Sequence, residues 1–466
     1  MPPMLALFLT VAFIFFLFAR DFRERPNVTA ALWLPFLWIV VSPGSRFLSQ
    51  WLTIFGLPVG GVTVEDGSPI DAAFFLAVIA SGVLVLHQRR VTLAKFIGNN
   101  YCLTLFLAYC LLAILWSDFP YVSFKRWIKL LGDPAMALIV LTEPDVIEAV
   151  TRLMKRCAFV MFPVSILFIK YFPNLGRLYD VWEGHPMYTG IATNKNELGF
   201  DCWILGAVLF WHALQVLQWD AGRKKRDEIL LCAGLLCMDL WLLKMAHSAS
   251  SFVALMLASG VMLFLGLRWV QKRHVTGYLL GGIAICALAG LGLGFLGSFI
   301  HLLGRDETFT GRTDIWHILW NWKVNPIVGT GFESFWLGDR REAVQNLYPG
   351  LNQAHNGYLE TYLNLGGIGV ALTVGILLAT YGKSRHELFR HFEFGRLRMA
   401  YLIAFIVYNW TEASFRQNAF PFFMFFLVAI DMPKSRKVVP ELVKTPSYQG
   451  THWIMAQAKG NNGFAR

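Results

Sequence analysis

Residues 354–382 read AHNGYLETYLNLGGIGVALTVGILLATYG, and this stretch decides the fold class. From residue 361 onward it is an uncharged, mostly apolar run that is long enough to cross a bilayer as a helix. Just before that run it places a histidine, an asparagine and a glutamate. The stretch therefore predicts a membrane helix that begins beside a group of polar side chains.

Apolar runs of this kind recur along the 466-residue chain, which is 56% hydrophobic and has a mean hydropathy of +0.50. Because the runs are continuous and not alternating, they exclude a transmembrane barrel. The first run lacks a basic start and a clear cleavage site, so we expect a span and not a signal peptide. We predict an all-α polytopic membrane protein with about 11–13 transmembrane helices. The candidate spans are residues 4–19, 30–43, 71–87, 101–116, 130–142, 157–171, 197–218, 229–246, 250–267, 276–300, 357–381, 398–411 and 417–431.

The loops between these spans differ in charge from one side to the other. The loops on the side that begins with residues 20–29, together with the C-terminal tail, hold most of the 41 Lys and Arg residues. The positive-inside rule predicts that this side faces the cytoplasm. The predicted organisation is a transmembrane domain over residues 1–431 and a disordered cytoplasmic tail over residues 432–466. The net charge of +11 is spread over short loops, which fits membrane lipids as partners and argues against nucleic acid.

Three polar segments lie on the opposite, external side. They are residues 116–129 (WSDFPYVSFKRWIK), residues 172–196 and a large loop over residues 301–356. The large loop is predicted to be ordered, with short helices over residues 313–324 and 335–348 around a tight turn at residues 325–335 (NPIVGTGFESF). In the span that follows, the small residues GGIGV at 366–370 are predicted to allow close packing between helices.

Two external arginines, Arg177 and Arg312, run against the charge bias of their side. A guanidinium there can hold a phosphate or pyrophosphate through paired hydrogen bonds. It can equally form an ordinary loop ion pair, for example between Arg312 and Asp314 or Glu307. Lys195, at the start of a span, can bind phosphate as a point charge or extend towards the membrane interface.

His355 is a candidate general base, because histidine serves this purpose most often, but it can also simply cap the next helix. The other histidines predicted to be external compete for the same role: His185, His247, His301 and His317. Asn356 and Glu360 can orient His355, and Glu360 can instead satisfy polar groups inside the helix bundle. Arg416, in a late external turn, can join the same site. The sequence shows no metal-ligand spacing and no cofactor motif, so Arg and Lys would have to neutralise a phosphate leaving group.

Several of these segments, in this order, resemble the O-antigen ligase and polymerase family: GRTDIW at 311–316, the turn at 325–335 and AHNGYLE at 354–360. The stretches SPGSRFLSQWL at 42–52 and HSASSFVAL at 247–255 look like the ExoQ-type exopolysaccharide branch. The resemblance runs from residue 30 to residue 430.

The resemblance implies a GT-C-like glycosyltransferase of the bacterial inner membrane with its active site facing the periplasm. Its donor would be a glycan on undecaprenyl pyrophosphate, and its acceptor another glycan or a lipid-linked sugar. Arg177 and Arg312 would bind the donor pyrophosphate, and His355 would lie beside the acceptor hydroxyl. Lys195, Asn356, Glu360 and Arg416 are then candidates for binding substrate, with no metal or other cofactor required. Other proteins of polysaccharide assembly or export are possible partners.

Several functions remain open at this point. A polymerase and a ligase that moves finished glycan to a lipid core differ only in the acceptor. A transporter would need charges at mid-membrane, for which Asp239 and Lys244 are the main candidates. A scaffold for a polysaccharide assembly would not need an ordered polar external loop.

Overall fold

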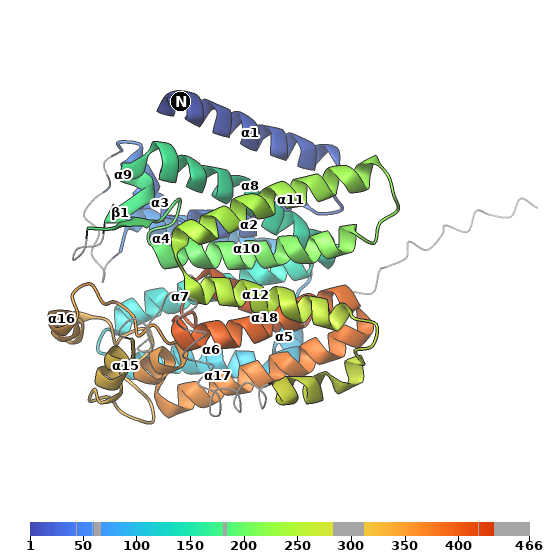
Figure 1. Ribbon diagram of the computed structural model, residues 1–466. Coiled ribbons are helices and arrows are strands. Elements are labelled where there is room, and N and C mark those ends of the chain that lie inside the picture. Colours follow the sequence, from blue (N-terminus) through green and yellow to red (C-terminus); the bar gives the residue numbers. More distant parts are fainter. Residues whose placement is uncertain are drawn as a thin grey trace, which may run out of the picture. The chain divides into compact units, whose positions relative to one another are not determined.

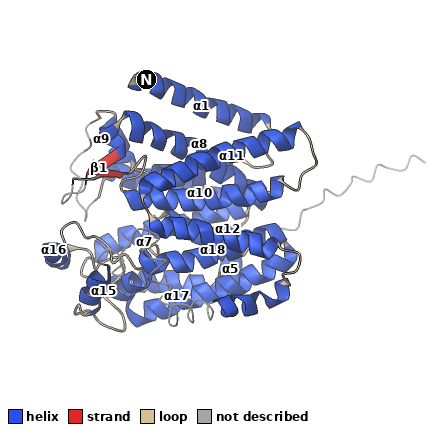
Figure 2. Cartoon of the chain, in the orientation of Figure 1, coloured by secondary structure: helices blue, strands red, loops and turns tan. Residues whose placement is uncertain are grey.

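Helices make up nearly all of the regular structure of this chain in the computed structural model (Figure 1). The structure describes residues 1–42, 44–57, 59, 67–179, 184–282, 312–417 and 419–432. Within these residues, strands are limited to a short antiparallel pair, β1 (Arg177–Tyr179) and β2 (Pro186–Tyr188) (Figure 2). The predicted all-α class is confirmed.

The α-helices of the described residues have the following bounds. In chain order they are α1 (Pro3–Arg23), α2 (Trp33–Val41), α3 (Leu48–Ile54), α4 (Pro69–Gln88), α5 (Leu93–Asn99), α6 (Tyr101–Leu112), α7 (Pro120–Leu141), α8 (Val146–Tyr171), α9 (Pro173–Gly176), α10 (Lys195–Val216), α11 (Arg223–Ala246), α12 (Ala249–Gly266), α15 (Arg312–Trp320), α16 (Gly338–Leu347), α17 (Gly357–Arg390), α18 (Phe392–Thr411) and α19 (Phe420–Ala429).

Six of the described helices are long and apolar enough to cross a membrane, and the bent pair Leu93–Asn99 and Tyr101–Trp116 makes a seventh if it forms one span. This number is below the predicted count because α7, α8 and α18 carry several charged residues, while α2 and α19 are short. Each predicted span within the described residues nevertheless coincides with a helix, so the polytopic membrane class is confirmed. The predicted span 276–300 lies largely outside the described residues, as do the predicted tail and residues 301–311 of the large loop.

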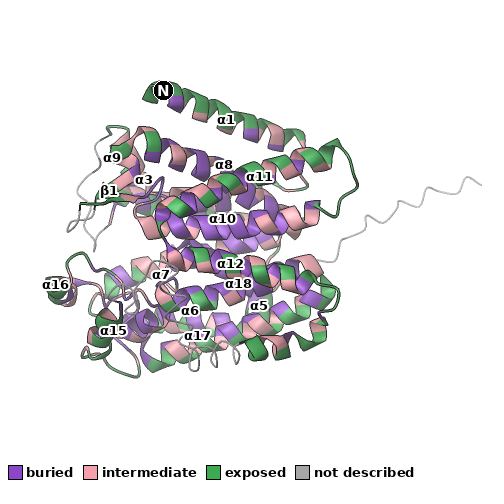
Figure 3. Cartoon of the chain, in the orientation of Figure 1, coloured by how far each residue is buried: buried purple, intermediate pink, exposed green. Residues whose placement is uncertain are grey.

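Burial divides the helices into a centre and a periphery (Figure 3). Every residue of α19 is buried, and most of α10 is buried as well. Helix α1 has few buried residues and exposes large apolar side chains, including Phe8, Phe15 and Phe16. Exposed apolar side chains on a helix of this length suit contact with lipid.

The end of the bundle that the charge rule assigns to the cytoplasm is held together by buried ion pairs. Asp21 of α1 accepts from Arg152 and Arg156 of α8, each at 2.8 Å. Glu228 of α11 pairs with Arg20 of α1 at 2.8 Å and also with Lys155 of α8. These pairs join three helices at one end of the bundle.

Helix α17 is interrupted in its first third. Gly366 has φ 65° and ψ −165°, which no right-handed helix contains. The break leaves carbonyl groups without a hydrogen-bond donor in the helix itself. These carbonyls accept hydrogen bonds from the turn at 325–335 and from α6. The amides of Thr330 and Gly331 donate to the carbonyls of Leu363 and Asn364 at 3.1 and 2.9 Å. The Tyr109 hydroxyl of α6 donates to the carbonyl of Leu365 at 2.9 Å.

The partner of this break is the predicted tight turn in residues 325–335. On the far side of Gly366, the amides of Gly367 and Ile368 donate to the carbonyls of Pro326 and Ile327 at 2.8 and 3.1 Å. The turn is therefore inserted into the helix through main-chain hydrogen bonds. The small residues at 366–370 thus serve a helix break, and the prediction that they allow close helix–helix packing is corrected.

The remainder of the external segment packs on the start of the same helix. Leu319 of α15 and Val344 of α16 form a cluster with Phe335, the last residue of the turn. Leu359 and Leu363 of α17 complete that cluster. The two short helices predicted in the large loop are thus present as α15 and α16, and they hold the entrance of α17 in place.

Candidate functional site

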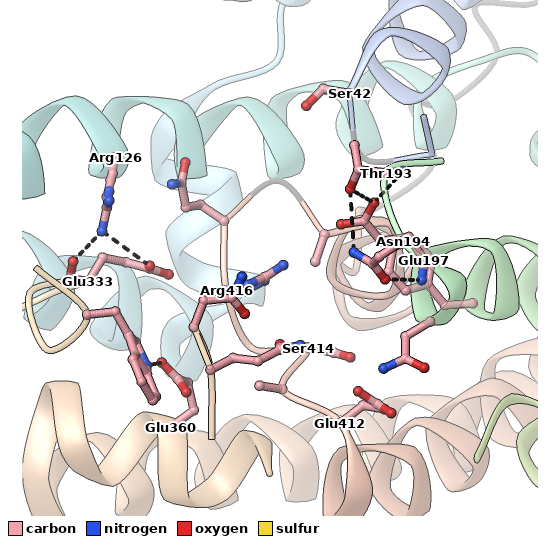
Figure 4. Close-up of a pocket in the computed structure, with 18 of the residues that line it drawn as sticks. Ser42, Arg126, Thr193, Asn194, Glu197, Glu333, Glu360, Glu412, Ser414 and Arg416 are labelled. Carbon is pink, nitrogen blue, oxygen red and sulfur yellow. Dashed lines mark hydrogen bonds and ion pairs between the residues drawn. The ribbon is translucent and has the colours of Figure 1, made fainter. Parts of the chain in front are cut away.

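A cavity of about 320 Å³ lies where the segments predicted to be external meet the ends of the helices (Figure 4). It collects side chains that are far apart in sequence. They come from the α2–α3 connection, from α7, from the start of α10, from α16, from the start of α17 and from the connection between α18 and α19. The polar external segments predicted from the sequence therefore contribute to one cavity.

The lining of this cavity is mostly polar. Its neutral side chains include several amides and hydroxyls, among them Ser45, Asn194, Asn196, Asn352 and Gln353. Amides, hydroxyls and an aromatic ring, here Trp336, are the groups that a sugar uses for hydrogen bonds and apolar contact. The charged side chains are Arg126, Lys129, Glu197, Glu333, Arg341, Glu360, Glu412 and Arg416.

Glu412 links two of the predicted catalytic residues to the cavity. It follows α18, is buried and accepts from the guanidinium of Arg312 at 2.7 Å. Its other oxygen lies 3.3 Å from Nδ1 of His355. His355 and Arg312 do not themselves line the cavity, but Glu412 does. Gln353, which also lines it, lies 3.4 Å from the same His355 nitrogen.

The charge of Glu412 decides how His355 is held. Burial by itself raises the pKa of Glu412, but the hydrogen bond with His355 and the charge of Arg312 outweigh burial and hold that pKa below its usual value. An ionised carboxylate only accepts hydrogen bonds, so Nδ1 of His355 is the donor in this contact. In the neutral imidazole the other ring nitrogen, Nε2, then carries the lone pair that a general base needs.

Arg312 and His355 are also fixed by the backbone. Arg312 opens α15, is buried and donates to the carbonyl of Thr411 in addition to Glu412. His355 has φ 48°, a left-handed conformation that turns the chain into α17. The expected pair of Arg312 with Asp314 is corrected, because Asp314 is exposed on α15 and the guanidinium binds Glu412. The alternative partner, Glu307, lies outside the described residues.

Asn356 and Glu360 fix the entrance of α17 and do not contact His355 in any described hydrogen bond. Asn356 is the N-cap, and its side-chain oxygen accepts from the amides of Tyr358 and Leu359, both at 3.0 Å. Glu360 accepts from Nε1 of Trp336 at 2.6 Å and from the amide of Ala354 at 2.8 Å. The expectation that these two residues orient His355 is corrected, since Glu412 has that contact.

The remaining predicted site residues are spread over different places. Arg177 lies on β1, where its guanidinium donates twice to the carbonyl of Ile169, at 2.9 and 2.6 Å, and stacks over Tyr188. Lys195 is the first residue of α10, and its neighbours Asn194 and Asn196 line the cavity. The structure brings Arg416 to the cavity but not Arg177 or Lys195.

Sequence reasoning missed three basic residues that line the cavity: Arg126 and Lys129 of α7 and Arg341 of α16. Part of the signal was present in the sequence. Residues 116–129 stand out as an external segment, and Arg126 and Lys129 run against the charge bias of that side just as Arg177 and Arg312 do.

Among the described residues, one group has a geometry that could hold a metal ion: His212, Glu228 and Cys232, whose candidate ligand atoms lie within 4.8 Å of one another. Glu228 in this group is already paired with Arg20 and Lys155. The group lies at the end of the bundle that carries the buried ion pairs and does not line the cavity. Two cations on the carboxylate disfavour a third, so we assign this group to packing of α10 on α11.

Comparisons with known proteins agree with this picture. A family model described as O-antigen ligase matches residues 233–374, which include Arg312, the turn at 325–335 and the start of α17. The exopolysaccharide production protein ExoQ of Rhizobium meliloti (strain 1021) is 28% identical over 324 residues, which cover 66% of this chain and 70% of that protein. The two matches agree with the resemblance read from the sequence: this chain is similar to the O-antigen ligase family over residues 233–374 and to an ExoQ protein over most of its length.

Proposed function

We propose that this protein is a glycosyltransferase that lengthens a glycan carried by undecaprenyl pyrophosphate, at the periplasmic face of the inner membrane and without a metal ion. The observation that carries the proposal is the polar cavity at the external end of the bundle, lined by Glu412 and backed by His355. Its amides and hydroxyls suit a glycan, and its basic side chains suit an anionic leaving group.

The reaction follows from the chemistry of such a donor. A hydroxyl oxygen of the acceptor glycan forms a bond to the anomeric carbon of the donor. The bond from that carbon to the pyrophosphate oxygen breaks, and the pyrophosphate leaves with the electron pair. The hydroxyl proton passes to Nε2 of His355, while Glu412 holds the imidazole through Nδ1 and stabilises the imidazolium that forms.

This assignment gives Arg312 a positioning function. Its guanidinium neutralises Glu412 and keeps the carboxylate oriented towards His355. Substitution of either Arg312 or Glu412 would break their ion pair, and the imidazole of His355 would lose its orientation. Positioned general bases contribute about 10²–10⁴-fold to rate, so the loss of His355 should reduce transfer by a factor in that range.

Reconstitution tests the proposal directly. The purified full-length protein is placed in liposomes with undecaprenyl-pyrophosphate-linked repeat units and EDTA, and longer lipid-linked glycans are detected by gel. A ladder is the expected result. Transfer that appears only after a lipid-core acceptor is added would identify a ligase. Movement of lipid-linked glycan across the bilayer without any transfer would establish a transporter instead.

His355→Ala supplies the residue-specific form of the same test. The matched control is His317→Ala, because His317 is an exposed histidine on the neighbouring helix α15 and does not line the cavity. The ladder should be lost or strongly reduced in the first variant and normal in the second. Normal chain growth by a folded His355→Ala protein would contradict the assignment of the base.

A further inference from the structure

Three basic side chains of the cavity have no acceptor among the described residues. They are Lys129 of α7, Arg341 of α16 and Arg416 of the α18–α19 connection, and all three line the cavity. None of the three makes a hydrogen bond or an ion pair to another described residue, and Nε of Arg341 is buried without a partner. All three side chains are partly exposed and line the cavity, so an anion that enters the cavity can reach them.

The ammonium of Lys129 is held between aromatic rings. Its Nζ lies 4.8 Å from the ring centre of Phe47 and 4.3 Å from that of Phe75. The nearby carboxylate of Asp71 does not pair with it, because both of its oxygens accept from Ser49, at 2.8 and 2.6 Å. The rings fix the position of the charge and leave its hydrogen atoms available to a ligand.

The carboxylates of the cavity have other partners. Glu197 accepts from the amide and the hydroxyl of Thr193, and Glu333 pairs with Arg126 at 3.9 Å. Glu360 is held by Trp336, as described above. The three cations therefore face the cavity from three elements. None of them forms an ion pair with a neighbouring carboxylate, although the charge of Glu360 acts on Arg416 and that of Glu333 acts on Lys129.

The two arginines that the family resemblance implicates in pyrophosphate binding differ in this respect. Arg177 donates to a main-chain carbonyl, and Arg312 donates to Glu412 and to the carbonyl of Thr411. Neither lines the cavity. From this contrast we infer that the diphosphate of the lipid-linked substrate is bound by Lys129, Arg341 and Arg416, and that Arg312 acts through Glu412. The identity of the anion rests on the proposed function.

A diphosphate fits this set for chemical reasons. It carries several negative charges and several acceptor oxygens on two adjacent phosphorus atoms, so it can reach cations on different walls of one cavity. Guanidinium groups bind its oxygens in pairs, whereas the lysine contributes a point charge. A neutral glycan alone would leave all three cations without an ion-pair partner among the described residues.

Binding measured apart from turnover tests the inference. The purified full-length protein in nanodiscs is titrated with undecaprenyl pyrophosphate, undecaprenyl phosphate and inorganic pyrophosphate, and dissociation constants are measured by thermophoresis. The variants are Lys129→Gln, Arg341→Gln and Arg416→Gln. The matched controls are Lys125→Gln, one turn earlier on α7, and Arg340→Gln, whose guanidinium pairs with Asp118; neither lines the cavity.

Each of the three variants should weaken binding of undecaprenyl pyrophosphate by about tenfold or more, as expected for the loss of a charge-assisted hydrogen bond. Lys129→Arg should retain most of the affinity, and the two controls should bind as the natural protein does. Unchanged binding in the three variants, with weakened binding in Arg312→Gln or Arg177→Gln, would overturn the inference and leave the proposed function standing. Binding of inorganic pyrophosphate without binding of the lipid would overturn the assignment to a lipid diphosphate. A natural protein that binds neither prenyl compound would contradict the proposed function itself.

Discussion

At the scale of single residues, Glu412 contacts both Arg312 and His355, so one substitution at Glu412 affects both partners. Glu412→Gln removes the negative charge, leaves Arg312 buried without its counter-charge and gives His355 a neutral neighbour. Breaking a buried ion pair from one side costs about 3–5 kcal/mol, so the free energy of unfolding should fall by an amount of that order. Transfer should fall by about 10²–10⁴-fold, because the imidazole loses its orientation.

Tryptophan fluorescence during denaturation in detergent measures the first effect, and the liposome ladder measures the second. Glu342→Gln is the control, since Glu342 is an exposed carboxylate on α16 that does not line the cavity. A Glu412→Gln protein that matches the natural protein in both measurements would contradict the positioning function of Glu412.

The lowered pKa of the Glu412 carboxylate predicts that the stability of the protein depends on pH. This pKa is lowered in the folded protein, while an unfolded glutamate titrates near about 4.3. The unfolded chain therefore binds the proton more readily, and the stabilisation from Glu412 is fully present above the unfolded value. It is lost as the pH falls through the lower folded value. Unfolding midpoints measured on the acid side should decline more in the natural protein than in Glu412→Gln, and parallel declines would show that Glu412 is not the group responsible.

The sequence supports part of this group but not its pairing. Arg312 and Arg416 stand out because basic residues are less common on the predicted external side, and His355 stands out because it lies just before an apolar span. The partner Glu412 lies 100 residues after Arg312 and 57 after His355. A contact between side chains on separate helices depends on how those helices pack, and the spacing of one sequence does not contain that information.

At the scale of elements, the break in α17 makes glycine necessary at particular positions. A Cβ on Gly329, which has φ 68°, would lie 2.5 Å from main-chain atoms of Asn364. Gly329→Ala should therefore separate the turn from the helix and lower the free energy of unfolding by about 1–3 kcal/mol or more. The transfer activity should fall with it, because the turn holds α15 and α16 at the cavity.

Gly375→Ala is the control. Gly375 lies in α17, and a Cβ added there would have no other atom within 4 Å. That change should be neutral or slightly stabilising, since alanine favours a helix over glycine by about 1 kcal/mol. Thermal unfolding of both variants in detergent checks the pair. Equal midpoints for Gly329→Ala and Gly375→Ala would mean that the turn does not depend on its glycine.

Some of these elements could be predicted from local sequence patterns, and the break in α17 could not. The turn at residues 325–335 and helices α15 and α16 follow from proline, glycine and apolar spacing within short windows. The break at Gly366 does not, because a small-residue run inside an apolar span is equally typical of helix packing. Only the docking of Pro326 and Ile327 on the far side of the glycine distinguishes the two, and that contact is not local.

At the scale of the whole molecule, the charge bias predicts which end of the bundle faces the periplasm. The cavity lies at the end opposite to the buried ion pairs of α1, α8 and α11. Single cysteines on a background without the native thiols test this orientation. A cysteine at Glu342 should react with a membrane-impermeant maleimide in intact cells, whereas a cysteine at Asp220 should react only after lysis; both positions are exposed. The reverse labelling pattern would invert the topology and move the cavity to the cytoplasm.

The composition predicts that this is a polytopic helical membrane protein, but it predicts the number of membrane-spanning helices less well. Continuous apolar runs identify polytopic helices, and each predicted span within the described residues coincides with one. The number that meets a strict length and composition criterion is lower, because helices such as α7 and α8 keep charged residues inside a protein interior and not in lipid. The sequence records hydrophobicity, but whether a charge faces lipid or a neighbouring helix depends on the assembled bundle.

The turn inserted at Gly366 also has a mechanical consequence. Four main-chain hydrogen bonds join residues 326–331 to both sides of the break, so the external segment and the membrane helix form one stiff connection. Tension applied to the segment, for instance by a long polymer held against α16, would load α17 directly and would not be absorbed by a slack loop. At about 0.5–1.5 kcal/mol for each hydrogen bond, yielding at this point costs several times the thermal energy. The outer end of α17 and the external segment should therefore move under load as a single body.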